Sequence, residues 1–290
     1  MSLRAARLLE ILLEMREEME REERRTSYLE GERRGGVIRT RARGTVAIVG
    51  DIHGDLETMR IILREAERKA DSLVLLGDYI DRGPPEGQVG VLEELYSLKM
   101  TMGERAVILR GNHEPGFGIA SSPHDFPMAL RLLFGETWRE LYDASVKLFE
   151  AMPHALILEG GLLALHGGPP VEPAPDPFTY LASGRERGRL VEILFNDPTE
   201  APVEAAPSPR GAGFVWGAAV TRRALNIVGA QLIVRGHEAP PEGFKFNHGK
   251  KVVTLFSRLG LPYLNSRAAF MLCAPEDISS PESCIITVTR

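Results

Sequence analysis

The feature that most restricts the fold is a repeated pattern in which a short apolar run ends in Gly and is followed by polar residues. The first three such runs are "TVAIVG" (45–50), "SLVLLG" (72–77) and "AVILRG" (106–111). The stretches between them, roughly 56–70 and 86–100, have helical patterns. Strands that alternate with helices predict βαβ crossovers and therefore a sheet with parallel strands.

Six further apolar runs follow in the second half of the chain. They are "ALILEG", "LLALHG", "LIVRGH", "VVTLFS", "AFMLCA" and "CIITVT". Several of them follow one another closely, which favours a second sheet that is mixed or antiparallel. Two Pro-rich segments, 169–178 and 198–209, interrupt them, and we expect both to be surface loops.

The N-terminal segment has a different character. Residues 3–24 are predicted to form a helix, because Leu and Met recur near helical spacing among Arg and Glu residues. A helix docked by one apolar stripe is favoured over a partner-binding helix. The following "GGVIRTRARG" (35–44) is predicted to be a linker. The expected division is therefore an N-terminal helix and linker over 1–44 and a catalytic domain over 45–290.

Composition narrows the class of protein. The chain has 290 residues, 43% of them hydrophobic and 26% charged, which is near the average for globular proteins. We expect a cytoplasmic protein, because its apolar runs are too short to span a bilayer and its start does not resemble a signal peptide. The net charge of −5 does not indicate a nucleic-acid binder. Cys273 and Cys284 are expected to be buried, reduced thiols, with a disulfide as the alternative.

Residues that can bind a metal or a phosphate follow five of the apolar runs. They are Asp51 and His53; Asp78, Asp81 and Arg82; Asn112, His113 and Glu114; His166; and Arg235 and His237. Carboxyl ends of parallel strands meet at one edge of a sheet, so we expect these side chains to converge. Carboxylates, an amide and imidazoles without thiolates suit Mn, Fe or Zn. Their number fits two ions that share a bridging carboxylate.

These blocks resemble a known family. "GDIHG", "GDYIDRG", "GNHE", "LHGG" and "RGH" are similar to the motifs of the metallophosphoesterases, and within them to the serine/threonine phosphoprotein phosphatases. The resemblance covers about residues 45–274 and points to a prokaryotic-like member. It implies an α/β fold, the calcineurin-like β-sandwich of two mixed sheets flanked by helices, here preceded by an N-terminal helix.

The resemblance also implies a role for each motif residue. Asp51 and His53 would hold one metal, and Asp78 would bridge both metals. The second metal would be held by Asn112, His166 and His237. Substrate phosphate would be bound by Arg82 and by Arg210, in "SPRGAGFVWG". His113 would be the general acid, oriented by Asp81.

Some assignments keep an alternative. The alternative to phosphate binding for Arg210 is a solvent-exposed loop arginine. Arg235 either contacts phosphate or pairs with a carboxylate such as Asp51. Glu114 is expected to be a hydrogen-bond partner rather than a metal ligand. Tyr263 is expected near the site, in place of a late tyrosine of the family. The three histidines outside the motifs are assigned to structure: His124, His154 and His248.

The sequence therefore predicts a two-metal hydrolase that removes phosphate from phosphoserine and phosphothreonine in proteins by direct attack of metal-bound hydroxide. The expected cofactors are two divalent ions, Mn first, with Fe or Zn as alternatives. A dinucleoside-polyphosphate hydrolase or a broad phosphoesterase would use the same motifs. A phosphate-binding scaffold that has lost catalysis would lack a metal ligand or the acid, and none of these residues is missing. Because "HGGPP" and the loop after it depart from the family pattern, regulatory-subunit docking is not carried over.

Overall fold

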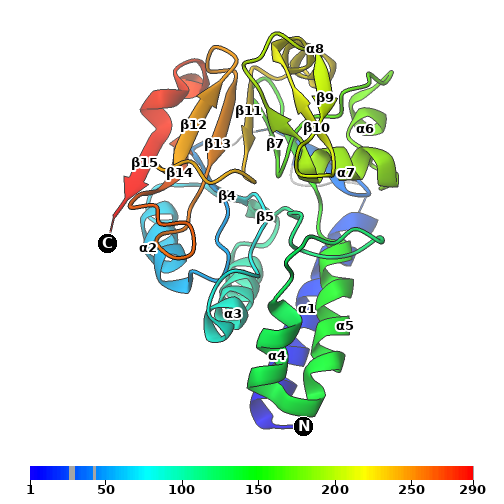
Figure 1. Cartoon of the computed structure of the whole chain (residues 1–290), viewed down its shortest axis with the longest axis vertical. Helices are drawn as coiled ribbons and strands as arrows, with labels where there is room; N and C mark the ends of the chain where they lie inside the picture. Colours follow the sequence, from blue (N-terminus) through cyan, green and yellow to red (C-terminus); the bar gives the residue numbers. More distant parts are fainter. Residues whose placement is uncertain (26–29, 42–43, 290) are drawn as a thin grey trace.

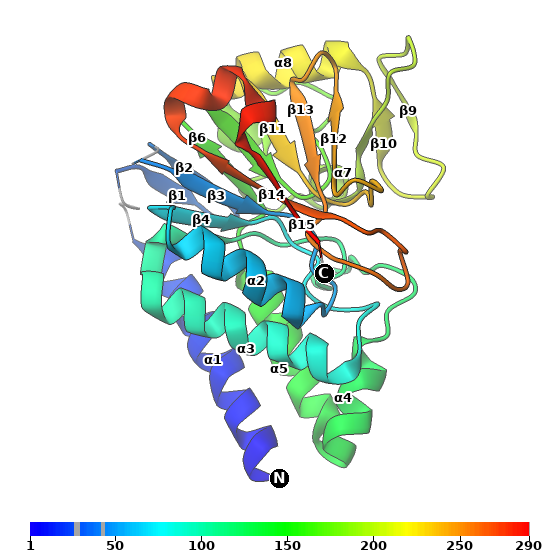
Figure 2. The same ribbon diagram turned by 90° about the vertical axis from the view of Figure 1, so that its left-hand side faces the viewer.

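Two β-sheets lie face to face, and helices cover their outer sides, as Figures 1 and 2 show. The structure is a computed structural model that describes residues 1–25, 30–41 and 44–289. Helix α8 (Ala218–Val228) covers the outer face of one sheet, while α2 (Leu56–Glu67) and α3 (Pro85–Met102) cover the outer face of the other. The predicted fold class, a sandwich of two mixed sheets flanked by helices, is confirmed.

The first sheet has five strands in the order β15-β14-β3-β4-β5. Its strands are β3 (Val46–Val49), β4 (Ser72–Leu75), β5 (Ala106–Ile108), β14 (Ala268–Cys273) and β15 (Ile285–Val288). Strands β3, β4 and β5 are parallel and are joined through α2 and α3, as predicted. The last two strands are antiparallel additions to this sheet, so the expectation that they belong to the second sheet is wrong.

The second sheet has seven strands in the order β1-β2-β6-β7-β11-β13-β12. They are β1 (Glu32–Arg34), β2 (Val37–Thr40), β6 (Ala155–Leu158), β7 (Leu162–Leu165), β11 (Leu232–Arg235), β12 (Phe244–Asn247) and β13 (Val252–Leu255). Strands β7, β11 and β13 are parallel to one another. The sheet is therefore mixed, as the close spacing of its strands indicated.

A small three-stranded sheet and the remaining helices complete the fold. The sheet has the order β8-β10-β9. Its strands are β8 (Asp197–Pro198), β9 (Ala205–Pro207) and β10 (Phe214–Trp216). The remaining helices are α1 (Leu3–Arg24), α4 (Phe126–Phe134), α5 (Trp138–Ala151), α6 (Pro177–Tyr180) and α7 (Arg187–Phe195). Four 3₁₀ turns are η1 (Gly103–Arg105), η2 (Gly135–Thr137), η3 (Pro275–Ser279) and η4 (Pro281–Cys284).

Strand β3 shows why the central runs are apolar throughout. Val46 and Ile48 point into the core between the two sheets, whereas Ala47 and Val49 join the cluster under the helices. Because successive side chains of a strand point to opposite faces, a strand that is buried on both faces must be apolar at every position. The short continuous runs of the sequence are thus explained by burial on both sides.

Three local expectations are corrected by the structure. The segment 35–44 is not a plain linker, because it contains β2, which pairs with β6; residues 42 and 43 lie outside the described residues. The Pro-rich segment 198–209 includes β9 and the end of β8. Cys273 and Cys284 form a disulfide, so the expected reduced thiols are not found. The division of the chain between 44 and 45 stays a prediction.

The N-terminal helix forms over the predicted residues and packs against α5. The Oγ atom of Ser2 caps its first turn by accepting the Ala5 N–H, and Leu12 and Met15 are among its fully buried residues. Across the described parts of the chain, no helix is both long enough and apolar enough to span a membrane.

A buried ionic cluster fixes the end of α1. The carboxylate of Glu22 lies 2.5 Å from Lys99 Nζ on α3 and 3.6 Å from Arg33 Nη1. Arg33 also donates to the carbonyl oxygens of Met19 and Ala151, and its side chain is 0% exposed. Lys99 depends on Glu22, because a charge buried without a partner is costly, whereas Arg33 also pairs with Glu23 at 3.3 Å.

We predict that Glu22→Ala strongly destabilises the protein. It leaves the buried Lys99 ammonium without its carboxylate, so the free energy of unfolding should fall by about 3–5 kcal/mol. Urea titration in the presence of a chelator measures this change. Glu17→Ala, on the exposed face of the same helix, is the control and should stay within about 0.5 kcal/mol. Equal stabilities of the two variants would show that the cluster does not hold α1.

Candidate active site

The polar residues that follow the strands meet in one cleft, as the sequence predicts. The cleft has a volume of about 740 Å³. Its polar lining includes Asp51, His53, Asp78, Arg82, Asn112, His113, Arg210, His237 and Tyr263. His166 follows β7 directly and is fully buried, with its Nε2 2.7 Å from Asn112 Oδ1. Both sheets therefore contribute side chains to the same site.

The backbone at these positions is held in an uncommon conformation. His53, Asp78 and His237 all have positive φ angles, of 45°, 58° and 70°. Each non-Gly residue in this region costs of the order of 1 kcal/mol or more and persists where the surrounding structure enforces it. Gly111 is required here, because a Cβ atom at this position would lie 2.3 Å from Asp78 Oδ1. The Gly residues of the motifs allow the strand ends to approach one another closely.

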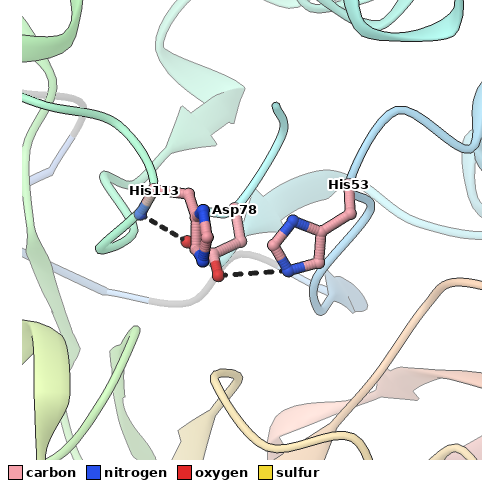
Figure 3. Close-up of side chains that lie close together, drawn as sticks. All are labelled: His53, Asp78 and His113. Atoms are coloured by element: carbon pink, nitrogen blue, oxygen red, sulfur yellow. Dashed lines mark hydrogen bonds and ion pairs between the residues drawn. The ribbon is translucent and has the colours of Figure 1, made fainter. Parts of the chain in front are cut away.

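Asp78 lies between two groups of possible metal ligands. One group is His53, Asp78 and His113, and the other is Asp78, His166 and His237; within each group the ligand atoms lie within 4.8 Å of one another. Asp78 Oδ2 is 3.4 Å from His53 Nε2, and Asp78 Oδ1 is 3.3 Å from His166 Nε2. Figure 3 shows the first group, in which the Asp78 carboxylate lies between His53 Nε2 and the backbone nitrogen of His113. The shared position agrees with a bridging carboxylate.

The remaining predicted ligands lie beside these groups. Asp51 Oδ2 is 3.9 Å from His53 Nε2, and Asp51 Oδ1 accepts the backbone N–H of His237. Asn112 Oδ1 is 2.7 Å from His166 Nε2 and 2.8 Å from His237 Nδ1. All six side chains that the sequence assigned to metal binding are thus brought together.

Hydrogen bonds orient two of the imidazoles for metal binding. His53 Nδ1 lies 2.8 Å from the carbonyl oxygen of Ile80, and His166 Nδ1 lies 3.0 Å from that of Leu76. A carbonyl oxygen only accepts, so each Nδ1 donates, and Nε2 of His53, whose ring is neutral, presents its lone pair to the Asp78 side. In the described part of the chain, the buried Nε2 of His237 has no hydrogen-bond partner. These donor atoms fit divalent cations.

The charge balance of the site also fits bound cations. Burial and the nearby charge of Asp78 raise the pKa of Asp51 to about 7. Burial lowers the pKa of His53 to about 3, which keeps this imidazole in its neutral, metal-binding form. A bound cation would favour the charged form of Asp51 and would neutralise the buried carboxylates of Asp51 and Asp78.

Glu114 stabilises the turns that carry the site residues and is a hydrogen-bond partner, as the sequence predicts. Its carboxylate accepts the backbone N–H groups of Asp78, Tyr79 and Gly111 at 2.8, 2.8 and 2.9 Å. These bonds tie the turn after β4 to the turn after β5. Glu114 therefore acts as a hydrogen-bond partner and does not face the cleft.

His113 and Asp81 form the predicted pair. His113 Nδ1 is 2.7 Å from Asp81 Oδ2, and Asp81 is fully buried. Burial opposes a charged imidazole, but the carboxylates of Asp78 and Asp81 outweigh this effect and raise the pKa of His113 to about 9. The imidazole is therefore protonated near neutral pH and can donate a proton into the cleft.

A second imidazole, His124, contacts the same carboxylate. His124 Nδ1 lies 2.9 Å from Asp81 Oδ2. The sequence assigned His124 to structure, because it belongs to no motif and no local pattern marks it. Only the folded chain shows that the segment before α4 returns to Asp81.

The three predicted arginines have different positions. Arg82 and Arg210 both line the cleft, and Arg210 Nε donates to Asp197 while its side chain is 48% exposed. Arg235 is fully buried: it donates to Gly167 O, Asn196 O, Asp197 and Glu238. These contacts support the carboxylate-pairing alternative, although the partners are Asp197 and Glu238 and not Asp51. Arg235 is thus removed from the phosphate-binding residues.

Tyr263 lies in the cleft wall, where the sequence expected it. Its ring is nearly parallel to that of His53, with 5.6 Å between the ring centroids and 24° between the planes. Phe256 contacts Tyr263 edge-on and also lines the cleft; the sequence gave no signal for it as a site residue, since its motif reads as a core strand. Aromatic rings therefore close the cleft on the His53 side.

Comparison with known proteins agrees with this geometry. A family model described as calcineurin-like phosphoesterase matches residues 44–241. A probable serine/threonine-protein phosphatase of Encephalitozoon cuniculi is 32% identical over 225 residues, which cover 76% of this chain and 48% of the relative. The serine/threonine-protein phosphatase PP1-1 of Saccharomyces cerevisiae is 31% identical over 241 residues, which cover 80% of this chain and 75% of that protein. The chain thus spans about half the length of the first of these relatives.

A solved structure shares the fold. It is a protein serine/threonine phosphatase from Saccharomyces cerevisiae with similarity to human phosphatase PP5. The TM-score is 0.75 at 20% identity, and the match covers 98% of this chain and 89% of the other. The similarity includes both sheets and therefore the frame that positions the cleft.

We predict that Asp78→Asn prevents stable binding of metal at this site. The variant removes the one charge that both ligand groups share, so the Mn²⁺ retained after dialysis should fall to near zero. Metal content is measured by mass spectrometry on the folded protein. Asp143→Asn, at an exposed position of α5, is the control and should retain the metal of the unchanged chain. Full retention by Asp78→Asn would contradict the bridging assignment.

Proposed function

The chain belongs to the calcineurin-like phosphoesterase family and, within it, to the serine/threonine-protein phosphatases, and on this premise we propose that it removes phosphate from phosphoserine and phosphothreonine side chains of proteins. The single observation that carries the proposal is the shared position of Asp78. This carboxylate lies between two imidazole groups in a cleft that also holds an acid and two arginines. Such a set matches hydrolysis of a phosphate ester with two cations.

Two divalent cations are part of the proposal, with Mn first and Fe or Zn as alternatives. Asp51 and His53 would hold one cation, and Asp78 would contact both. The second cation would be held by Asn112, His166 and His237. When bound, such cations lower the pKa of water and offset the charge of the phosphoryl group.

Arg82 and Arg210 supply the binding of the phosphoryl oxygens. A guanidinium group stays charged at every relevant pH and meets two phosphate oxygens at once. Arg210 is oriented by Asp197, which also binds the buried Arg235. Arg210 is thus linked, through the Asp197 carboxylate, to Arg235 in β11.

His113 supplies the proton that the leaving group needs. A serine or threonine alkoxide is a poor leaving group, so proton donation in the transition state accelerates its departure. Asp81 accepts the Nδ1–H of His113, which leaves Nε2–H as the group that donates. The ring lies at the cleft surface, where a leaving oxygen can reach it.

Hydrolysis of dinucleoside polyphosphates is the second candidate, because its chemistry needs the same cations and arginines. Two relatives that are more than 30% identical favour the protein substrate, since both are named serine/threonine-protein phosphatases. We retain the nucleotide as the competing substrate in the assay.

The proposal is tested by steady-state kinetics with Mn²⁺. We expect kcat/KM for a phosphoserine peptide to exceed that for diadenosine tetraphosphate by at least about tenfold, which corresponds to about 1.4 kcal/mol in the transition state. Hydrolysis of an aryl phosphate should be stimulated by Mn²⁺ and abolished by a chelator. A clear preference for the nucleotide would reject the protein substrate, and activity that persists in chelator would reject the metal-dependent reaction.

We further predict that His113→Asn lowers kcat for the phosphoserine peptide by about 10²–10⁴-fold, because the leaving alkoxide loses its proton donor. The metal content should remain that of the unchanged protein, which separates this variant from Asp78→Asn. Full turnover by His113→Asn would show that another group, or water, protonates the leaving oxygen.

A further inference from the structure

The carboxylate of Asp81 accepts hydrogen bonds from four different groups. Oδ1 accepts the backbone N–H groups of Asp125 and Phe126, both at 2.8 Å. Oδ2 is contacted by the Nδ1 atoms of His113 and His124, at 2.7 and 2.9 Å, and His124 Nδ1 also lies 3.1 Å from Oδ1. A carboxylate offers about four lone-pair sites, so this set matches its full capacity.

His124 is itself held from its other side. Its Nε2 lies 3.1 Å from the hydroxyl oxygen of Tyr142 on α5, and the two rings are 5.7 Å apart. Because Asp81 is an acceptor, Nδ1 donates to it, and Nε2 faces the Tyr142 hydroxyl. The ring is therefore clamped between α5 and Asp81, with 16% of its side chain exposed.

The bond from His124 restricts how His113 can point. The start of α4 holds Oδ1 of Asp81, and His124 Nδ1 approaches the same carboxylate between its two oxygens, 3.1 Å from Oδ1 and 2.9 Å from Oδ2. The direction at Oδ2 that these contacts leave open is the one that His113 occupies, at 2.7 Å. A general acid must point at its target, and misplacement of a reacting group by about 1 Å can cost about 10²-fold in rate.

From this geometry we infer that His124 is a positioning residue, which holds the Asp81 carboxylate so that His113 is aimed at the leaving oxygen of the substrate. The inference rests on the proposed phosphoesterase function and extends it to a residue outside the motifs. His124 acts through Asp81 and is not one of the residues that line the cleft.

The test compares two phosphate monoesters with different leaving groups. A phosphoserine peptide needs a general acid, whereas 2,4-dinitrophenyl phosphate releases a stable phenolate and needs almost none. We expect His124→Ala to lower kcat by at least about tenfold for the peptide and by less than about twofold for the dinitrophenyl ester. His124→Asn, whose amide N–H can replace the Nδ1–H bond, should recover most of the loss.

Two controls separate positioning from general damage. His248→Asn changes another buried histidine, bonded to Thr221 and Thr199 outside the cleft, and should leave the ratio of the two rates unchanged. In the His113→Asn background, His124→Ala should cause little additional loss, because both act through one proton donor. Metal content is measured for every variant.

Three results would overturn the inference: equal losses on both substrates, no loss on the peptide, or a crystal structure of His124→Ala in which Asp81 and His113 keep their positions. The third readout does not depend on activity. If the unchanged protein hydrolyses neither ester, the proposed function is wrong. That result differs from one in which the unchanged protein is active and the variants lose activity on one ester only.

Discussion

The site depends on the burial of two like charges. Asp51 and Asp78 both lie at the bottom of the cleft, nearly inaccessible to water, and their mutual repulsion adds to the cost of burial. The chain supplies backbone N–H groups to both, since Asp51 accepts from His237 and Asp78 accepts from His113. Hydrogen bonds of this kind lessen the cost but leave the net negative charge, and that remaining charge is what gives the cleft its affinity for cations.

The two-sheet frame makes this burial achievable. The strand ends of both sheets reach the cleft, and the inter-sheet core of Val, Ile and Leu fixes their separation. Glu114 then joins the turns after β4 and β5, and the motif glycines allow the backbones to come within contact distance. Positive φ angles at His53, Asp78 and His237 are stable here because the neighbouring contacts leave these residues no alternative.

The sequence was sufficient for the central strands of both sheets and for most of the cleft, because both depend on short patterns. A run such as "SLVLLG" needs only its own residues to indicate a buried strand, and the polar residues after it mark the strand's end. Long-range contacts carry no such local signal. Nothing near His124 shows that it returns to Asp81, the partners of Arg235 lie on other segments, and β2 became a strand because β6 was available to pair with it. The disulfide between Cys273 and Cys284 likewise depended on how the last strand turns back.

The attachment of α1 has a consequence for the way the chain is synthesised. The helix is made before α5, which covers its apolar stripe together with α3, and the Arg33 contact that secures its end reaches a carbonyl 118 residues further along. A ribosome adds about 5–20 residues per second, so the stripe stays uncovered for several seconds or longer while the intervening strands emerge. During that interval the nascent chain exposes Leu and Met side chains to any binding partner in its surroundings, and a holdase chaperone is suited to cover them until α5 leaves the exit tunnel.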